Sequence, residues 1–268
     1  SNVPRYIYDS LELAKKESNL AAVIIYFDSG GGDIYASVES YRLIRDFTKK
    51  SKIPVYAYIP RIAGSGAYYM ALGTGEIIAD PVAEIGSIGV IIERLKTYEF
   101  GRRHGIAIQS IKTGPHKDGG QWKRPNAADR AIDQRVIDVM FEYFLQAVID
   151  SRSKYSLEEL KTDAKKQGSI SSGAWFIARD AIAKGLIDKE MTFEEFLAYV
   201  AKNISVNDAR KFRNADFVKY DEKISILDEW RLHFKKSQIS GSVSKETLRG
   251  DNGTCMPSII DSVLKNGE

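Results

Sequence analysis

The feature that most constrains the fold is a buried-strand pattern that leads directly into glycines and then into a helix pattern. Residues 21–27 form an uninterrupted apolar run rich in β-branched side chains, which is typical of a parallel strand covered on both faces. Asp28-Ser29-Gly30-Gly31-Gly32 follows, and apolar residues then recur at helical spacing over residues 34–44. Further strands are predicted at residues 54–59, 76–79, 88–92 and 106–112. This repeated alternation predicts an α/β protein built from wrapped strand and helix units.

Helices are predicted between and after these strands, at residues 7–14, 34–44, from Gly64 onward, and at 98–104, 127–152, 156–167, 174–184 and 192–202. The longest is expected to bury a face made of Ile132, Val136, Val139, Tyr143, Phe144 and Ala147. Beyond residue 204 the composition changes to a charged helix pattern around residues 224–234 and a Ser/Gly/Asn-rich stretch from residue 237. We therefore predict a domain over residues 1–204, followed by a charged helical segment and flexible tail over residues 205–268.

Composition excludes several classes of protein. The 268 residues, 43% of them hydrophobic, suffice for one α/β domain with a sizeable core. The 39 basic and 36 acidic residues leave a net charge of only +3, which does not indicate a nucleic-acid-binding protein. A single cysteine, Cys255, excludes an internal disulfide framework and a cysteine zinc cluster. We expect no metal and no cofactor.

The apolar runs are too short to span a bilayer, and the first residues carry no signal-peptide pattern. We therefore expect this chain to be a soluble domain. Because a helix pattern begins almost at once after Ser1-Asn2-Val3, we also expect an excised domain that lacks an upstream part, the first strand of the fold included.

Ser65 and Lys117 are the candidate catalytic residues. Ser65 lies among small residues in Ala63-Gly64-Ser65-Gly66-Ala67, and Lys117 lies in a Gly- and Pro-rich stretch, residues 114–126, predicted as a long surface loop. A serine hydroxyl needs a base, and a neutral lysine amine can act as one. Small neighbours let a carbonyl approach the hydroxyl and leave the next backbone N–H facing a developing oxyanion.

Each of these residues also has a simpler explanation. A serine flanked by glycines is equally well explained as a helix N-cap, and loop lysines are usually solvated. His116 is an alternative base for Ser65, but a histidine beside a loop proline is more often a structural hydrogen-bonding group.

The cluster Gly30-Gly31-Gly32 suits a phosphate cradle, an oxyanion hole or a plain tight turn. It lacks the Lys and Ser/Thr of a nucleotide P-loop and the spacing of a dinucleotide fingerprint. Of the two functional interpretations, the oxyanion hole fits better.

Four motifs in this order resemble the signal peptide peptidase A family of serine proteases, of the Clp protease/crotonase superfold, in a short single-repeat form. The resemblance covers about residues 5–202. Residues 28–32 are similar to the family's Asp-Ser-Pro-Gly-Gly loop with glycine in place of proline, and residues 64–69 to its nucleophile motif. Residues 86–90 match its Gly-Ser-Ile/Leu-Gly-Val element, and residues 111–118 resemble the segment that carries its lysine.

The resemblance implies a Clp protease/crotonase-like repeated ββα superhelix with a C-terminal helical extension. It assigns Ser65 as nucleophile, Lys117 as general base, the Gly31 and Gly66 amides as oxyanion hole, and Ser87 as the group that orients the lysine.

The resemblance also implies a homo-oligomeric ring in which adjacent protomers share each dyad. The expected substrates are leftover signal peptides or other membrane-associated or misfolded peptides, and the expected membrane anchor is an N-terminal helix absent from this chain.

Two rival hypotheses remain. One is a scaffolding relative with a vestigial dyad, against which the presence of both Ser65 and Lys117 argues. The other is a crotonase-like acyl-coenzyme A enzyme, which would need carboxylates as acid and base; only Asp28 and Asp33 lie beside the glycine loops.

Overall fold

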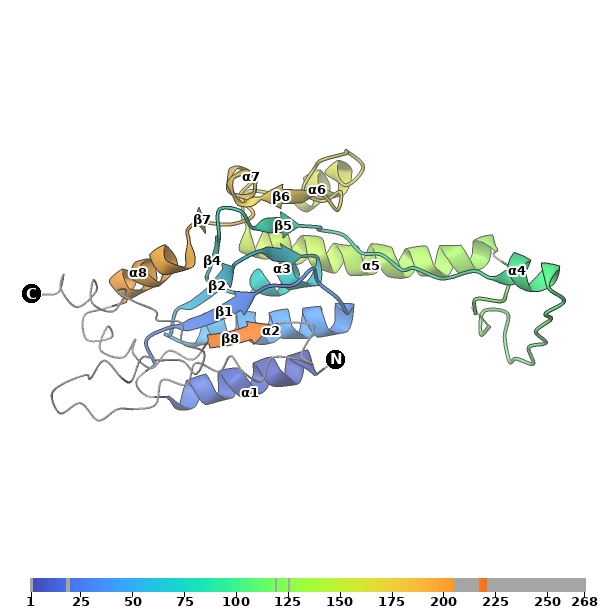
Figure 1. The fold of residues 1–268 in the computed structure, drawn as a ribbon, viewed down its shortest axis with the longest axis horizontal. Helices are drawn as coiled ribbons and strands as arrows, with labels where there is room; N and C mark the ends of the chain where they lie inside the picture. Colours follow the sequence, from blue (N-terminus) through green and yellow to red (C-terminus); the bar gives the residue numbers. More distant parts are fainter. Residues whose placement is uncertain (1, 18–19, 119, 125, 205–216, 221–268) are drawn as a thin grey trace, which may run out of the picture. The chain divides into compact units, whose positions relative to one another are not determined.

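The computed structural model describes residues 2–17, 20–118, 120–124, 126–204 and 217–220 (Figure 1). The chain divides into two compact units, and each is described by itself below. The first unit comprises residues 1–86 and 175–268, and the second comprises residues 87–174. The predicted boundary near residue 204 stays a prediction, and the helix expected around residues 224–234 lies outside the described residues.

The centre of the first unit is a five-stranded parallel sheet with the order β7-β4-β2-β1-β8. Its strands are β1 (Val23–Phe27), β2 (Val55–Ile59), β4 (Glu76–Ala79), β7 (Lys189–Glu190) and β8 (Phe217–Tyr220). The first three were predicted, because strands buried on both faces are written as continuous apolar runs. β7 and β8 were not predicted; β7 is only two residues long, and both strands lie far along the chain from their partners.

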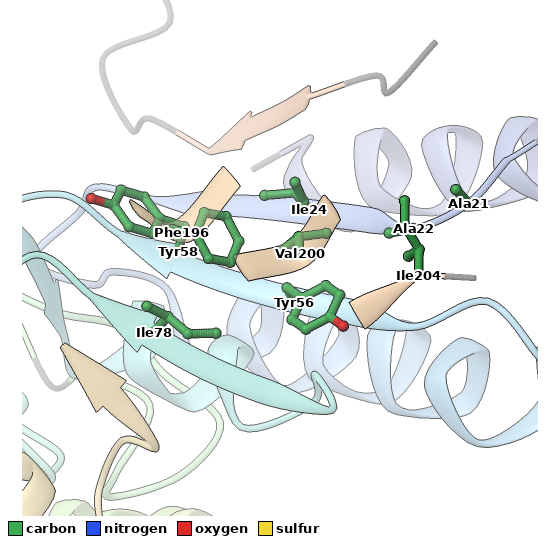
Figure 2. Packing of buried hydrophobic residues seen from close by; sticks show 9 residues of the cluster. All are labelled: Ala21, Ala22, Ile24, Tyr56, Tyr58, Ile78, Phe196, Val200 and Ile204. Atoms are coloured by element: carbon green, nitrogen blue, oxygen red, sulfur yellow. The ribbon is translucent and has the colours of Figure 1, made fainter. Parts of the chain in front are cut away.

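One face of this sheet packs against α8 (Phe193–Asn203). Alternate residues of neighbouring strands point to the same face, so Ile24, Tyr58 and Ile78 join one cluster with Phe196 of α8 (Figure 2). The Tyr58 and Phe196 rings stack with centroids 4.9 Å apart. Elsewhere in the unit, α3 (Gly66–Ala71) contacts β1, α2 (Ile34–Lys50) packs against α3, and α1 (Val3–Lys16) packs against α2.

A second, three-stranded sheet lies beyond the ends of these strands, with the order β3-β5-β6. Its strands are β3 (Ile62–Gly64), β5 (Glu84–Gly86) and β6 (Trp175–Ile177), and a bridge joins Ser29 to Ala63. β2 continues into β3 and β4 into β5, so each of these strand pairs contributes one strand to each sheet, and α3 connects the two pairs. This confirms the α/β class and the repeated ββα arrangement.

Residues 175–177 correct one helix prediction. A helix was expected over residues 174–184, but Trp175-Phe176-Ile177 pairs antiparallel with β5, and helix α7 (Ala178–Ala183) begins only afterwards. The reason is local alternation: the Phe176 side chain is buried, whereas Trp175 and Ile177 are exposed.

The second unit contains α4 (Tyr98–Arg103), α5 (Ala127–Ser151) and α6 (Leu157–Asp163). The strands predicted at residues 88–92 and 106–112 are wrong: both segments are irregular and have no ladder partner in the described part of the chain. Ile88 is buried, but Ile91, Ile106, Ile108 and Ile111 are exposed, with Ile111 97% accessible. A strand pattern without a neighbouring strand leaves its backbone groups unpaired, so it does not form a sheet.

The predicted buried face of α5 is also wrong over most of its length. Phe144 and Ala147 are buried, but the other four residues of that face are exposed by 43–50% of their surface, namely Ile132, Val136, Val139 and Tyr143. Periodicity defines which residues share a face, whereas burial requires a neighbouring element along the whole helix. No helix among the residues described is long and apolar enough to cross a membrane.

Candidate active site

Ser65 occupies a sharp turn between β3 and α3. Its backbone has φ 47° and ψ −120°, and it is one of two non-glycine residues with positive φ in the described part of the chain. The Ser65 N–H donates to the Gly86 carbonyl at 2.9 Å, and the Ser65 carbonyl accepts from the Tyr69 N–H at 2.9 Å. The surrounding structure thus holds a conformation that costs about 1–3 kcal/mol on its own, and such strain clusters at functional sites.

The geometry of the turn bears on the helix-cap explanation of Ser65. The residue does occupy the N-cap position of α3, but its side chain makes no capping hydrogen bond. A capping serine would have an extended backbone, and its hydroxyl oxygen would accept an N–H of the first helical turn. The Ser65 hydroxyl therefore does not cap α3.

The glycine loop that follows β1 packs directly against this turn. Gly31 has φ +110°, and a Cβ placed on it would lie 2.7 Å from the Gly66 nitrogen and 2.8 Å from the Ser65 Cβ. Gly66 is equally confined, since its Cβ would lie 2.2 Å from the Ser37 hydroxyl oxygen. Only glycine permits this approach of the two backbones.

Two predicted oxyanion residues, Gly31 and Gly66, are thereby brought together with Ser65. Gly66 is the first residue of α3, so its N–H has no acceptor within the helix. The Gly31 N–H donates to the Ser29 hydroxyl at 3.1 Å, so in this structure it is paired within the loop.

Both carboxylates beside the glycine loop interact with other groups of the first unit. Asp33 caps α2, because its Oδ1 accepts the Ala36 N–H at 2.8 Å. This negative charge occupies the helix N-terminus where a phosphate cradle would need an anion. Asp28 is buried and forms an ion pair with Arg61 at 2.8 Å. Neither carboxylate is placed as the acid or base of an acyl-coenzyme A enzyme.

Lys117 and Ser87 belong to the second unit. Ser87 also has a positive φ, 50°, and its N–H donates to the Ala174 carbonyl at 2.8 Å. Lys117 lies exposed in a turn, residues 114–118, and its N–H donates to the Gly114 carbonyl at 3.3 Å.

Both sequence neighbours of Lys117 are held by side-chain contacts, Asp118 by ion pairs and His116 by a hydrogen bond. Asp118 pairs with Lys112 at 2.6 Å and with Lys123 at 3.1 Å, and Lys123 also reaches Asp129 at 2.8 Å. The His116 ring nitrogen Nδ1 lies 2.9 Å from the same Asp129 carboxylate. Lys123, followed by His116, holds the pKa of Asp129 below its ordinary value, and Lys112, followed by Lys123, does the same for the pKa of Asp118. The contact with Asp129 is of the kind expected for a structural hydrogen-bonding histidine, and the role of His116 stays a prediction.

Sequence reasoning singled out neither Arg61 nor Ser29. Arg61 lies 33 residues from Asp28, so no local spacing marks the pair; only the alignment of β1 with β2 could have indicated it.

The protein thus has an α/β fold, and Ser65, in a strained turn packed against the Gly31 loop, is its candidate nucleophile. Comparison with known families then identifies the chain: the family model for Peptidase family S49 matches residues 48–207, and the chain belongs to this family.

Two relatives illustrate the similarity. "Putative protease MJ0651" of Methanocaldococcus jannaschii is 27% identical over 217 residues, which are 81% of this chain and 65% of that protein. "Putative signal peptide peptidase SppA" of Enterococcus faecium is 26% identical over 200 residues, 74% of this chain and 56% of that protein. The chain thus spans less than two thirds of the length of either relative.

Among solved structures, a mutant of ClpP1 from Listeria monocytogenes aligns with a TM-score of 0.47 and 15% identity, over 72% of this chain and 86% of that chain.

Proposed function

We propose that this chain is the catalytic part of a serine endopeptidase in which Ser65 is the nucleophile and Lys117 the general base. Neutral Lys117 takes the hydroxyl proton as Ser65 Oγ bonds to the peptide carbonyl carbon, and the carbonyl oxygen becomes an oxyanion. The protonated lysine then gives its proton to the leaving amine as the C–N bond breaks. Water, deprotonated by the lysine, hydrolyses the acyl-enzyme and restores Ser65.

The observation that carries this proposal is the contact of the Gly31 loop with the Ser65 turn. A Cβ on Gly31 would lie 2.7 Å from the Gly66 nitrogen and 2.8 Å from the Ser65 Cβ, so the Gly31 backbone lies against the Ser65 turn, and this closeness supports Gly31 and Gly66 as the oxyanion residues. One such donor is typically worth roughly 3–4 kcal/mol of transition-state stabilisation. Membership of a peptidase family supports the same chemistry.

Lys117 and Ser87 complete the proposed site. The hydrogen bond of His116 and the ion pairs of Asp118 fix the chain on both sides of Lys117, while the Lys117 amine has no hydrogen-bond or ion-pair partner in the part of the chain that is described. Ser87 would orient this amine through its hydroxyl.

The test is active-site labelling. A fluorophosphonate should modify Ser65 in the wild-type protein, as mapped by mass spectrometry, whereas Ser65→Ala and Lys117→Met should neither label nor hydrolyse peptides. Ser172→Ala, which alters a serine elsewhere in the chain, is the matched control and should behave as wild type. Full peptide hydrolysis by purified Ser65→Ala would refute the mechanism.

The same experiment separates the rival functions. A scaffolding relative would neither label nor hydrolyse peptides, and an acyl-coenzyme A enzyme would act on a thioester without modification of Ser65.

We further propose that the protein assembles as a homo-oligomeric ring in which adjacent protomers share each dyad. The exposed apolar face of α5, made of Ile132, Val136, Val139 and Tyr143, supports such an assembly, because an apolar stripe of this kind is usually covered by a partner. The substrates would be leftover signal peptides or other membrane-associated or misfolded peptides, which agrees with the name of the Enterococcus relative. An N-terminal helix outside this chain would supply the membrane anchor.

Mixed rings test the shared dyad. If Ser65→Ala and Lys117→Met protomers regain activity after they are dissociated together and reassembled, each site draws its two residues from different chains. Confirmed mixed rings without activity would exclude this arrangement.

A further inference from the structure

The strongest unexplained feature of the first unit is the ion pair between Asp28 and Arg61. Both the Nε and Nη2 atoms of Arg61 donate to Asp28 Oδ2, at 3.0 and 2.8 Å. The Asp28 side chain is 6% exposed, whereas that of Arg61 is 77% exposed. A charged group is seldom buried this deeply without a partner, so Arg61 is what makes the burial of Asp28 tolerable.

The second carboxylate oxygen of Asp28 adds to the dependence of this side chain on Arg61. Asp28 Oδ1 is buried and accepts no hydrogen bond within the described residues. Every polar contact of the carboxylate there comes from Arg61. Removal of the guanidinium would leave a buried charge without compensation.

Two neighbouring chain segments, residues 28–31 and 61–65, connect this pair to the candidate active site. Asp28 directly precedes the Ser29–Gly31 loop, and Arg61 directly precedes β3, which leads to Ser65. Between the two ends, the Ser29 N–H donates to the Ile62 carbonyl and the Gly64 N–H donates to the Ser29 carbonyl, both at 3.0 Å. At the far end, Gly31 meets Gly66 and Ser65.

We infer that Asp28 and Arg61 are positioning residues that fix the register of the Gly31 loop against the Ser65 turn. The inference rests on the proposed function, since it assigns these residues a role in peptide hydrolysis through the oxyanion hole. The Gly30-Gly31-Gly32 run has little rigidity of its own, because glycine has the largest conformational freedom. The ion pair supplies an anchor about three residues, roughly 10 Å, from the oxyanion donors.

The test uses Arg61→Gln and Arg61→Lys, with Lys50→Gln as matched control. Lys50 forms a 2.7 Å ion pair with Asp46 on α2, with both side chains exposed, so its loss removes an ion pair without touching the loop. Both Arg61 variants should lower kcat about 10- to 100-fold with KM changed less than about twofold, because a misplaced donor acts on the transition state. The rate of Ser65 modification by a fluorophosphonate should fall in the same proportion, while Lys50→Gln stays at wild-type values.

A variant with both partners replaced covers the case in which an unpaired Asp28 prevents folding. Asp28→Leu combined with Arg61→Met removes both charges and keeps apolar volume, so it should fold and still show the loss in kcat. Wild-type kcat in this folded variant would overturn the inference. A rise in KM with unchanged kcat in Arg61→Gln would also overturn it, since Arg61 would then bind substrate directly.

Hydrogen exchange separates this inference from the proposed function. The Ser29 and Gly64 amides should exchange at least about tenfold faster in Arg61→Gln than in wild type. Unchanged exchange overturns the role of the pair whatever the activity. A wild-type protein that neither labels at Ser65 nor hydrolyses peptides overturns the proposed function, and the exchange measurement still decides whether the pair holds the loop.

Discussion

Gly31→Ala is the most direct perturbation of the contact between the glycine loop and the Ser65 turn. The new methyl group would lie 2.7 Å from the Gly66 nitrogen, 2.8 Å from the Gly64 carbonyl oxygen and 2.8 Å from the Ser65 Cβ. Two of these atoms are backbone and the third is fixed to it, so no side-chain rotation relieves the overlap. The φ of +110° is in addition a conformation that alanine rarely adopts.

The expected loss of stability follows from these two effects. Backbone strain at such a φ costs about 1–3 kcal/mol, and overpacking costs about another 1–3 kcal/mol. The reduced freedom of the unfolded chain returns about 0.4–1 kcal/mol. We therefore expect the free energy of unfolding, measured by urea denaturation, to fall by about 1–5 kcal/mol.

Activity should fall more than stability alone explains. Displacement of the loop moves the Gly31 amide away from the Gly66 amide, and loss of one oxyanion donor lowers kcat about 100- to 1,000-fold with little change in KM. Peptide hydrolysis under conditions where the variant is fully folded measures this effect.

Gly30→Ala provides the matched control one residue earlier. A Cβ on Gly30 meets no atom within 4 Å, and its φ is outside the positive range. This variant should keep wild-type activity and be as stable as wild type or slightly more so. Equal stability and equal kcat of the two variants would refute the close approach of the loop to the nucleophile turn.

Three further predictions concern the core, the ion pairs beside Lys117 and the assembly of protomers. Phe196→Ala removes a fully buried ring that stacks on Tyr58 and should lower the free energy of unfolding by about 3–5 kcal/mol in urea, whereas Lys202→Ala on the exposed side of α8 should change it by less than about 0.5 kcal/mol. The pKa of Asp129 is depressed in the folded protein, first of all by Lys123. The stability that Asp129 contributes is therefore present above the ordinary carboxyl pKa and is lost as pH falls through the depressed value. In Lys123→Met, an NMR titration should show that the pKa of Asp129 rises. Val136→Asp together with Val139→Asp should abolish oligomers in native mass spectrometry while Asp138→Ala keeps them, and oligomers that survive the double variant would exclude this face of α5 as the interface.

The buried strands could be predicted because the apolar residues of each strand are themselves the signal of its burial. β1, β2 and β4 each lie within two residues of the predicted bounds, since a strand covered on both faces must be apolar at every position. The same rule failed at residues 88–92 and 106–112. Those segments have the composition of strands but no strand to pair with among the residues that the structure describes, and composition does not encode the presence of a neighbour.

The candidate site was likewise predictable from the sequence only in part. The small residues around Ser65 are visible in the sequence, because close backbone approach requires glycine. The partner of that approach is not visible: nothing in the spacing between residues 31 and 66 reveals that a Cβ on Gly31 would overlap the Gly66 amide. The Asp28–Arg61 pair was missed for the same reason.

The sequence by itself determined the buried strands β1, β2 and β4 and the positions of most helices, and it placed a serine among small residues between them. These are properties of period and side-chain size, which act within a few residues. Tertiary structure alone decided the left-handed backbone of Ser65, the contact of the Gly31 loop with it, and the exposure of the apolar face of α5. These depend on strand register and on which elements pack together, and such contacts join residues that are tens of positions apart.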